Sequence, residues 1–383
     1  MCYNTGVRKT FLYRIYPTVR QRRLMDQTLE ECRWLYNRLL EERELAWEAG
    51  GVNVSLYDQH KRLVPLKAER PSLEAVHSQV LQNVALRIDL TFKAFFRRVR
   101  AGEKPGYPRF RGRGRYDSFC YPQAPSGCKL EGNQLHLSKI GPVRVVLHRP
   151  LDGTPKTVCI RRSATGKWYA TFSCDWEPSP LPVAEEAVGI DVGLTTFAAL
   201  SDGTAIDNPR FFRREEKALA RAQRRLSKEA KGTAQRRRRK KVAARVHERV
   251  ANRRRDFAHQ HSRRIINRFQ VIAVEDLAVN RMVHNHCLAK SIHDAAWSQF
   301  TSYLSYKAAS AGRSFVAVNP AYTTQDCSGC GHRQPVPLSE RVYRCPCCRL
   351  ELDRDHNASL NIRALGLQSL GLALEAPGFS RAE

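Results

Sequence analysis

The apolar positions in the N-terminal quarter of the chain repeat with two different periods. Residues 8–17 combine aromatic and β-branched side chains, which is typical of a strand. The next apolar residues recur at spacings of four and three, on one face of a helix: Met25, Leu29, Cys32, Tyr36 and Leu39. A second helix is predicted to begin near Ser72, a suitable N-cap after Pro71. Its apolar face is formed by Leu81, Val84, Ile88, Phe92, Phe95 and Val99. Both faces indicate core packing.

The pattern becomes irregular and basic after Gly102. The stretch GYPRFRGRGRYDSFCYP at 106–122 alternates two kinds of side chain: Arg109, Arg111, Arg113 and Arg115 with Tyr107, Phe110, Tyr116 and Phe119. Because guanidinium groups bind phosphates and aromatic rings stack on bases, this mixture suits RNA or single strands. A solvated basic loop is the alternative interpretation.

Residues 128–176 return to short strands separated by turns. Turns are predicted at Gly132-Asn133 and at Gly166, each between two strands of a hairpin. This pattern indicates a small antiparallel barrel or sandwich. The proline-rich segment 178–182 is then predicted to be a linker.

The C-terminal half alternates apolar strands with long helices. Residues 187–206 predict a buried strand that ends at Asp191, followed by two short strands. Residues 269–277 predict a second buried strand, which ends at Glu275. A helix over 290–312, a strand over 313–320, a cysteine cluster and a final helix over 355–366 follow.

The net charge of the chain indicates which class of partner it binds. The chain of 383 residues has 65 Lys and Arg against 37 Asp and Glu, a net charge of +28. Residues 210–255 contain 20 Lys and Arg against four Glu, a net charge of +16, and predict two basic helices joined at Gly232-Thr233. Such an excess favours contact with a nucleic acid over a solvated charge run. The candidate contacts here are Arg224, Arg225, Arg236, Arg237, Arg238, Arg239, Lys240, Lys241, Arg253 and Arg254.

The sequence also indicates the cellular compartment of the protein. No stretch of 18 apolar residues is present, and the N-terminal residues MCYNTGVRKT lack the apolar core of a signal peptide. We therefore expect a cytoplasmic protein without a membrane partner. Thiols stay reduced in the cytosol, so the 12 cysteines favour metal binding over disulfides.

Two CxxC pairs supply the most specific signal in the chain. Cys327 and Cys330 form the first pair and Cys345 and Cys348 the second, with 14 residues between the pairs. Four thiolates close a tetrahedral shell, as a structural zinc ion requires, and leave no position for a catalytic water. Cys347 could replace Cys348, although the spacing favours Cys348. The remaining cysteines, from Cys2 to Cys287, are expected to be buried thiols, and the HNHC stretch at 284–287 to be a polar loop.

Three carboxylates form a second candidate site. Asp191 and Glu275 each end an apolar strand, and Asp355 stands at the start of the last helix. An acid at a strand end is more often a cap or a turn residue. However, the order of strands, helices and acids is that of an RNase H-like fold, in which parallel strands bring the acids together. Clustered carboxylates bind Mg²⁺ or Mn²⁺, and two such ions can support phosphodiester hydrolysis. Asp353 competes with Asp355 for the third position.

Taken together, these features resemble the TnpB (OrfB) family of transposon-encoded proteins, which are relatives of the type V CRISPR effectors. The resemblance rests on GIDVGLTTFAALSDG, LARAQRRLSKEAKGT, HERVANRRRDFAHQ, VIAVEDLAV, NPAYTTQDCSGCG and LDRDHNASLNI, and on VLQNVALRIDLTFKAFF and GYPRF nearer the N-terminus. These motifs follow the family's order over nearly the whole chain. One departure is Arg349, where the family often has Gly, and we expect a modest effect on the cysteine loop.

The resemblance implies a multidomain α+β architecture. It implies a wedge-type β-barrel (1–17 and 105–183) with an inserted helical recognition domain (18–104). A RuvC-type nuclease domain (184–324 and 350–370) would follow, with an inserted zinc-finger target-nucleic-acid-binding module (325–349) and a tail (371–383). By matching motifs, Asp191, Glu275 and Asp355 correspond to the RuvC triad.

The resemblance also implies an activity. The expected protein is an RNA-guided DNA endonuclease with structural zinc and catalytic Mg²⁺ or Mn²⁺. Its partners would be a guide RNA from the transposon end and a double-stranded DNA target, and no small-molecule substrate is expected. A cleavage-deficient RNA-guided repressor and a transposase that joins DNA strands are the alternatives.

Overall fold

The computed structural model describes residues 8–337 and 339–372 of the chain. It divides into two compact units, Met1–Glu177 and Pro178–Glu383. The predicted domain boundaries within each unit stay predictions. Cys2 and most of the predicted tail lie outside the described residues.

A nearly closed antiparallel sheet of seven strands forms the base of the first unit, in the order β2-β6-β7-β1-β5-β4-β3. The strands are β1 (Arg8–Tyr16), β2 (Ser118–Tyr121), β3 (Cys128–Glu131), β4 (Gln134–Leu137), β5 (Gly141–Val146), β6 (Thr154–Arg162) and β7 (Trp168–Asp175). Alternate residues of β1, namely Phe11, Tyr13 and Ile15, are fully buried, as the period of two requires. The predicted hairpin turns at Gly132-Asn133 and Gly166 are both present.

Three helices connect β1 to β2: α1 (Val19–Gly50), α2 (Leu56–Glu69) and α3 (Ser78–Arg100). The predicted apolar face of α1 is confirmed, because Met25, Leu29, Cys32, Tyr36 and Leu39 are all buried. The sheet and these helices share one hydrophobic core.

The helix predicted to start near Ser72 was placed too early. Ser72 lies in a short 3-10 helix, Pro71–Ala75, and α3 begins six residues later at Ser78. The predicted face is buried as far as Phe92, but Val99 is 48% exposed, because the last turns of α3 carry Arg97, Arg98 and Arg100 and extend beyond the core. Helix α2 was not predicted.

The second unit is built on a five-stranded sheet in the order β10-β9-β8-β11-β12. Its strands are β8 (Ala187–Val192), β9 (Thr196–Leu200), β10 (Ala205–Asp207), β11 (Val271–Glu275) and β12 (Ser314–Val318). Strands β8, β11 and β12 are parallel, whereas β9 pairs antiparallel with β8 and β10 pairs antiparallel with β9.

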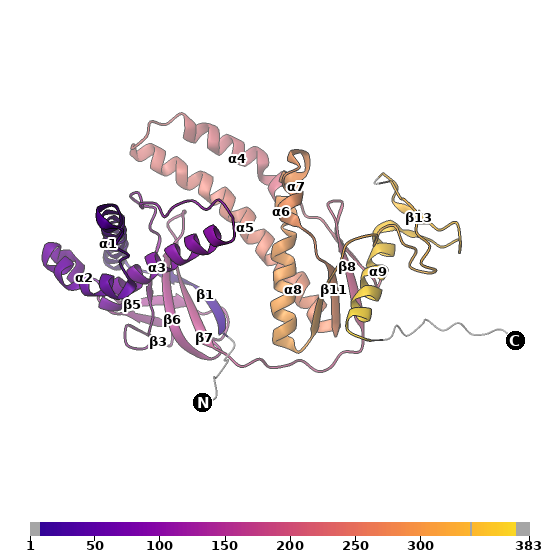
Figure 1. Cartoon of the computed structure of the whole chain (residues 1–383), viewed down its shortest axis with the longest axis horizontal. Coiled ribbons are helices and arrows are strands. Elements are labelled where there is room, and N and C mark those ends of the chain that lie inside the picture. Colours follow the sequence, from indigo (N-terminus) through magenta and orange to yellow (C-terminus); the bar gives the residue numbers. More distant parts are fainter. Residues whose placement is uncertain (1–7, 338, 373–383) are drawn as a thin grey trace. The chain divides into compact units, whose positions relative to one another are not determined.

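Helices cover both faces of this sheet (Figure 1). Ile272 and Val274 of β11 share a core with α5 (Ala234–Arg268) and α8 (Trp297–Ala311). The intervening Ala273 packs instead with Ile362 of α9 (Arg354–Ser369). A sheet buried on both faces explains the continuous apolar runs in β8 and β11. No helix in the described ranges is long and apolar enough to cross a membrane.

The remaining elements refine the prediction for this unit. The two basic helices are α4 (Phe211–Ser227) and α5, and Thr233 caps α5 at the predicted break. The helix expected over 290–312 is divided into α7 (His286–Ala295) and α8, because Ala296 adopts a left-handed φ of 57°. The hairpin of β13 (Val342–Arg344) and β14 (Glu351–Asp353) and the short α6 (Val279–Met282) were not predicted.

Two expectations for the cysteines were wrong. Cys120 and Cys159 face each other across β2 and β6 and form a disulfide. The sequence could not indicate this pair, because it depends on strand register. Cys287 is exposed at the start of α7, not buried, and Asn285 caps that helix where a loop was expected. Cys32, Cys128 and Cys174 are buried thiols, as predicted.

Candidate functional site

The first two acids lie at the carboxyl ends of neighbouring parallel strands. In the register of β8 and β11, Ile190 pairs with Val274. Asp191 and Glu275 directly follow these two residues, so both carboxylates arise at the same edge of the sheet.

Helix α9 brings Asp355 toward this edge. The helix can approach β8 closely because residue 189 is glycine: a Cβ there would meet the carbonyl oxygen of Ser359 and the backbone of Arg363. Gly366 has the same role against Ala273 of β11. Asp355 lies in the first turn of α9, beside the sheet edge that carries the other two acids.

Asp353 has a different task from Asp355. It is the N-cap of α9, and its Oδ1 accepts hydrogen bonds from the backbone N–H groups of Asp355 (2.9 Å) and His356 (3.1 Å). The carboxylate of Asp355 instead lies 3.4 Å from a guanidinium nitrogen of Arg354 and 3.7 Å from one of Arg341.

The three acids interact electrostatically. Burial, together with the charges of Glu275 and Asp355, raises the pKa of Asp191 to about 8. Burial also raises the pKa of Glu275, against a 2.6 Å hydrogen bond that its Oε1 accepts from the hydroxyl of Thr323. Mutual repulsion in a half-buried site is the signature of carboxylates that a cation can stabilise.

The four predicted zinc ligands are gathered into one cluster. The Sγ atoms of Cys327, Cys330, Cys345 and Cys348 all lie within 4.8 Å of one another, and Cys347 is outside this group. The Cys327–Cys348 and Cys330–Cys345 distances are 3.5 and 3.6 Å. A tetrahedral ion with bonds of about 2.3 Å separates its sulfur ligands by about 3.8 Å, so the cluster fits zinc. Across the described ranges this is the only set of three or more potential ligands gathered so tightly; the three carboxylates are more widely spaced.

Arg349 lies in the cysteine loop with a positive φ of 63°. A glycine adopts this conformation without steric cost, whereas an L-residue there costs about 1 kcal/mol. The departure from the family pattern therefore adds local backbone strain next to Cys348.

Two asparagines of α9 link the cysteine cluster to the acids. Asn357 donates to the carbonyl oxygen of Asp326 and accepts from the N–H of Ser328, both at 2.9 Å. Asn361 donates to the carbonyl oxygens of Thr323 and Asp326. One helix thus carries Asp355 and fixes the segment that leads from Thr323, the partner of Glu275, into Cys327.

Arg341 is a site residue that no sequence pattern indicated. This residue precedes β13, and its guanidinium contacts the hydroxyl of Thr195 (3.0 Å) and the carboxylate of Asp355 (3.7 Å). It therefore reaches from the cysteine-rich segment to the turn after β8. A prediction of β13 would have placed Arg341 next to a strand of the cysteine-rich segment and so could have drawn attention to it. We did not predict that strand.

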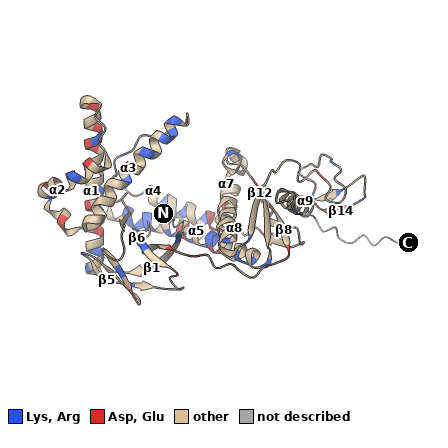
Figure 2. Cartoon of the chain, turned by 60° about the horizontal axis from the view of Figure 1, so that its bottom comes forward, with Lys and Arg blue, Asp and Glu red and all other residues tan. Residues whose placement is uncertain are grey.

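Ten of the 13 arginines and lysines predicted to bind nucleic acid have exposed side chains: Arg109, Arg111, Arg113, Arg224, Arg225, Arg237, Arg238, Lys240, Lys241 and Arg253. Figure 2 marks in blue the positions of the basic residues along α5. Arg236 donates to the carbonyl oxygens of Leu226 and Glu229 at the break between α4 and α5. Arg239 forms an ion pair with Glu229 at 3.5 Å.

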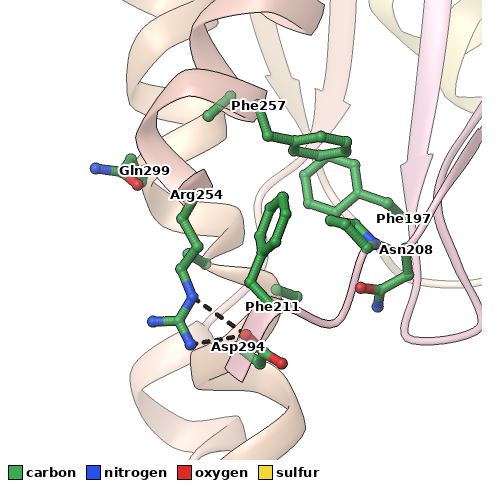
Figure 3. Close-up of a pocket in the computed structure, with 11 residues that line it drawn as sticks. Phe197, Asn208, Phe211, Arg254, Phe257, Asp294 and Gln299 are labelled. Atoms are coloured by element: carbon green, nitrogen blue, oxygen red, sulfur yellow. Dashed lines mark hydrogen bonds and ion pairs between the residues drawn. The ribbon is translucent and has the colours of Figure 1, made fainter. Parts of the chain in front are cut away.

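Arg254 is held by an internal partner. Its guanidinium forms an ion pair of 2.7 Å with Asp294 at the end of α7 (Figure 3). The side chain of Asp294 is only 4% exposed. Asp294 also accepts the backbone N–H groups of Phe212 and Arg213, which begin α4. The adjoining cavity measures about 10 Å³, room for one water. The pair therefore fixes α4, α5 and α7 to one another.

Comparisons with known proteins agree with this architecture. A family model described as "Probable transposase" matches residues 171–286, one described as "Cas12f1-like, TNB domain" matches 297–362, and one described as "Helix-turn-helix domain" matches 1–51. In this chain, the described part of that last region consists of strand β1 and helix α1.

Two curated relatives are similar over almost their whole length. A protein of Streptomyces pristinaespiralis named "Putative RNA-guided DNA endonuclease" is 35% identical over 94% of this chain and 90% of its own. The Escherichia coli K12 protein InsQ, with the same description, is 32% identical over 94% of this chain and 92% of its own. The chain therefore belongs to the TnpB (OrfB) family.

A solved structure shares the fold. The Cas12f1 chain of a cryo-EM complex with sgRNA and target DNA superposes with a TM-score of 0.57 at 14% identity. The match covers 93% of this chain and 98% of that chain. This chain therefore has the mixed α/β fold of a compact Cas12f effector.

Proposed function

We propose that this protein is an RNA-guided DNA endonuclease that hydrolyses target DNA in a metal-dependent reaction. The observation that carries the proposal is the convergence of Asp191, Glu275 and Asp355 at one edge of a sheet with the RNase H-like strand order. The names of the two curated relatives support the same activity.

The three acids would act as the metal-binding and catalytic residues. When bound there, Mg²⁺ or Mn²⁺ supplies polarisation of an attacking water and neutralisation of charge at the leaving 3′ oxygen. Asp191 would lose its proton to bind a cation, because its pKa lies near 8 in the absence of one. The hydroxyl of Thr323 holds one oxygen of Glu275 and leaves the other to act as a ligand.

Arg341 would hold the phosphate at this site. Its guanidinium already lies against Asp355, on the side from which the cysteine-rich segment approaches the acids. An arginine that neutralises a carboxylate before substrate binds can exchange that partner for a phosphodiester, which has the same two-oxygen geometry.

The zinc module would position both Arg341 and Asp355. The four thiolates would hold a structural ion, and the hydrogen bonds of Asn357 and Asn361 connect the backbone beside the cluster to α9. We retain residues 325–349 as the zinc-finger module inserted in a RuvC-like domain, and residues 1–17 with 105–183 as the wedge domain.

The basic surfaces would hold the guide RNA and its duplex with target DNA. Exposed guanidinium and ammonium groups of α4, α5 and the 106–122 loop bind backbone phosphates, which leaves sequence choice to base pairing. The guide RNA would derive from the end of the transposon that encodes the protein, and the DNA target would be double-stranded.

The proposal is tested by expressing the gene with its flanking transposon sequence and sequencing the RNA that copurifies. We expect one discrete RNA whose 3′ part matches sequence beyond the transposon end, retained by the Asp191→Ala variant. Absence of a discrete RNA contradicts guidance. RNA binding without any DNA cleavage would favour the repressor, and RNA-independent joining of transposon ends would favour the transposase.

A further inference from the structure

The first unit contains a pocket of about 340 Å³ between α1, α3 and the basic loop. Its walls include three arginines, two tyrosines and one leucine: Arg87, Arg111, Arg115, Tyr36, Tyr116 and Leu90. Pockets of this size accommodate a molecule of about one nucleotide.

The loop is fixed to α1 at the mouth of the pocket. Asn37 forms two hydrogen bonds with the backbone of Arg111, accepting from its N–H at 2.7 Å and donating to its carbonyl oxygen at 3.1 Å. Arg33 donates to the same carbonyl oxygen. These bonds hold the guanidinium of Arg111 5.4 Å from the ring centroid of Tyr36. They involve the backbone of residue 111 and do not depend on its side chain.

A tight turn returns the loop to the pocket. The N–H of Arg115 donates to the carbonyl oxygen of Gly112, and Gly114 supplies the positive φ of 74° that the turn requires. Arg115 and Arg111 consequently line the same pocket, although three residues separate them.

The floor is rigid and charged. Arg87 donates to the carbonyl oxygen of Ser118 (2.8 Å), to the hydroxyl of Tyr116 (3.2 Å) and to Cys120 Sγ (2.9 Å). Tyr116 is 7% exposed. A preorganised guanidinium in this position adds positive potential to the pocket at no further cost in side-chain entropy.

The positive charge of the pocket is not compensated by the protein. Within the described ranges, Arg87, Arg111 and Arg115 form no ion pair, and the carboxylate of Asp117, which also lines the pocket, is paired with Arg161 at 3.1 Å. Three guanidinium groups without a carboxylate partner around one small space favour an anion. Because Arg87 already donates to groups of the protein, the planar forks of Arg111 and Arg115 are the ones that match a phosphate. Leu90, 54% exposed, offers an apolar wall for a sugar or base.

We propose that this pocket binds a single nucleotide of the nucleic acid that the protein carries, with its phosphate against Arg111 and Arg115. This inference rests on the proposed function, since it presupposes a bound RNA or DNA strand. It extends that function by assigning a nucleotide-sized site in which Arg87 and Tyr36 of the helices, which were not among the predicted contacts, join Arg115 and Tyr116 of the loop.

The test is ultraviolet crosslinking of the intact complex, with the crosslinked peptides and nucleotides identified by mass spectrometry. We compare the wild type, the double variant Arg111→Ala/Arg115→Ala and the control Arg97→Ala/Arg100→Ala, which loses the same charge from exposed positions on the last turn of α3. The complex is irradiated with guide RNA alone and with RNA plus target DNA, so that the strand of origin is identified. Thermal melting confirms that each variant is folded.

We expect peptides from the pocket to crosslink to one nucleotide position. Removing two charged contacts should lower this yield about tenfold in the Arg111/Arg115 variant and leave it near wild type in the control. An equal reduction in both variants, or crosslinks spread over many nucleotides, would each overturn the proposal. A wild-type protein without bound RNA would instead reject the proposed function.

Discussion

At the scale of single residues, two aspartates that are separated by one residue have different tasks. Asp353 caps α9 with its side chain, whereas Asp355 faces Arg354 and Arg341 beside the other two acids. The residue types are identical, so the distinction depends on which way each side chain points at the first turn of a helix.

Substituting these two aspartates separately gives opposite outcomes. Asp355→Asn should abolish DNA cleavage and leave guide RNA binding unchanged, because it removes a charge from the metal site. Asp353→Asn retains a side chain that can cap a helix, so it should keep most of the cleavage, while Asp353→Ala should lower the free energy of unfolding by about 1 kcal/mol. Plasmid cleavage and thermal melting distinguish these effects. Loss of cleavage in Asp353→Asn with full activity in Asp355→Asn would reverse the assignment.

The raised pKa of Asp191 predicts a pH-dependent affinity for metal. When the pH lies below the Asp191 pKa of about 8, the metal-free carboxyl holds a proton that cation binding must release. The apparent Mg²⁺ or Mn²⁺ dissociation constant should therefore fall by up to about tenfold per pH unit as pH rises toward 8, and level off above it. Without metal, the same shift makes the folded state bind more protons than the unfolded state, so the free energy of unfolding should decrease as pH rises from about 4 to 8.

Calorimetric titration with Mn²⁺ at pH 6.5, 7.2 and 8.5 measures this dependence. The Asp191→Asn variant is the control, since it has no proton to release at this position. A dissociation constant that does not change with pH in the wild type would contradict the coupling.

At the scale of elements, the basic hairpin of α4 and α5 contains two neighbouring arginines with different environments. Arg254 is paired with the buried Asp294, whereas Arg253 is exposed and shares Glu215 with Arg249. Adjacent positions on a helix point about 100° apart, so one can face the body of the unit and the other solvent.

This difference predicts separate losses of stability and of binding. Arg254→Ala should lower the free energy of unfolding by about 3 to 5 kcal/mol, because it leaves Asp294 buried and unpaired. Arg253→Ala should have little effect on unfolding but should reduce the slope of log binding constant against log salt by up to about one. Chemical denaturation and salt-dependent RNA binding measure the two effects. Equal stability of the two variants would contradict the structural role of Arg254.

The elements also show how far the sequence could predict the fold. Periodicity identified the buried face of α1, and continuous apolar runs identified the strands β8 and β11. The helices α4 and α5 were identified from their run of basic residues and the break at Gly232-Thr233. Periodicity missed α2, which has only three buried residues, and the hairpin β13–β14, whose strands have three residues each. A helix with few buried residues and strands of three residues lack the repeated apolar positions that a pattern requires.

At the scale of the whole molecule, three features together indicate a protein that acts on nucleic acid: the acids, the cysteine cluster and the basic helices. The sequence placed the three acids on the correct elements, because strand ends are readable from a pattern. It could not indicate Arg341 or the hydrogen bonds of Asn357 and Asn361, since these depend on how the cysteine-rich segment packs against α9. The disulfide between Cys120 and Cys159 was missed for the same reason.

The role of the cysteine cluster predicts a selective effect of zinc removal. Cys330→Ser, or treatment with a chelator followed by an excess of Mg²⁺, should reduce DNA cleavage at least about tenfold while RNA affinity changes little, because Arg341 and Asp355 lose their support. Arg341→Ala should have a similar effect without releasing zinc, and Arg344→Ala, which removes an exposed arginine paired with Glu351, is its control. Cleavage rate, RNA affinity and bound zinc are measured in parallel. Parallel loss of cleavage and RNA binding would assign zinc to folding of the whole unit.

The central claim is that an RNA directs this acidic site to cut DNA. The most direct measurement programs the purified complex with a guide whose targeting part has been replaced, and follows a supercoiled plasmid that carries the new target. We predict cleavage at that target with Mg²⁺, none with EDTA and none by the Asp191→Ala variant, which should still bind the guide. Cleavage that ignores the guide, or that persists without Asp191, would contradict the account.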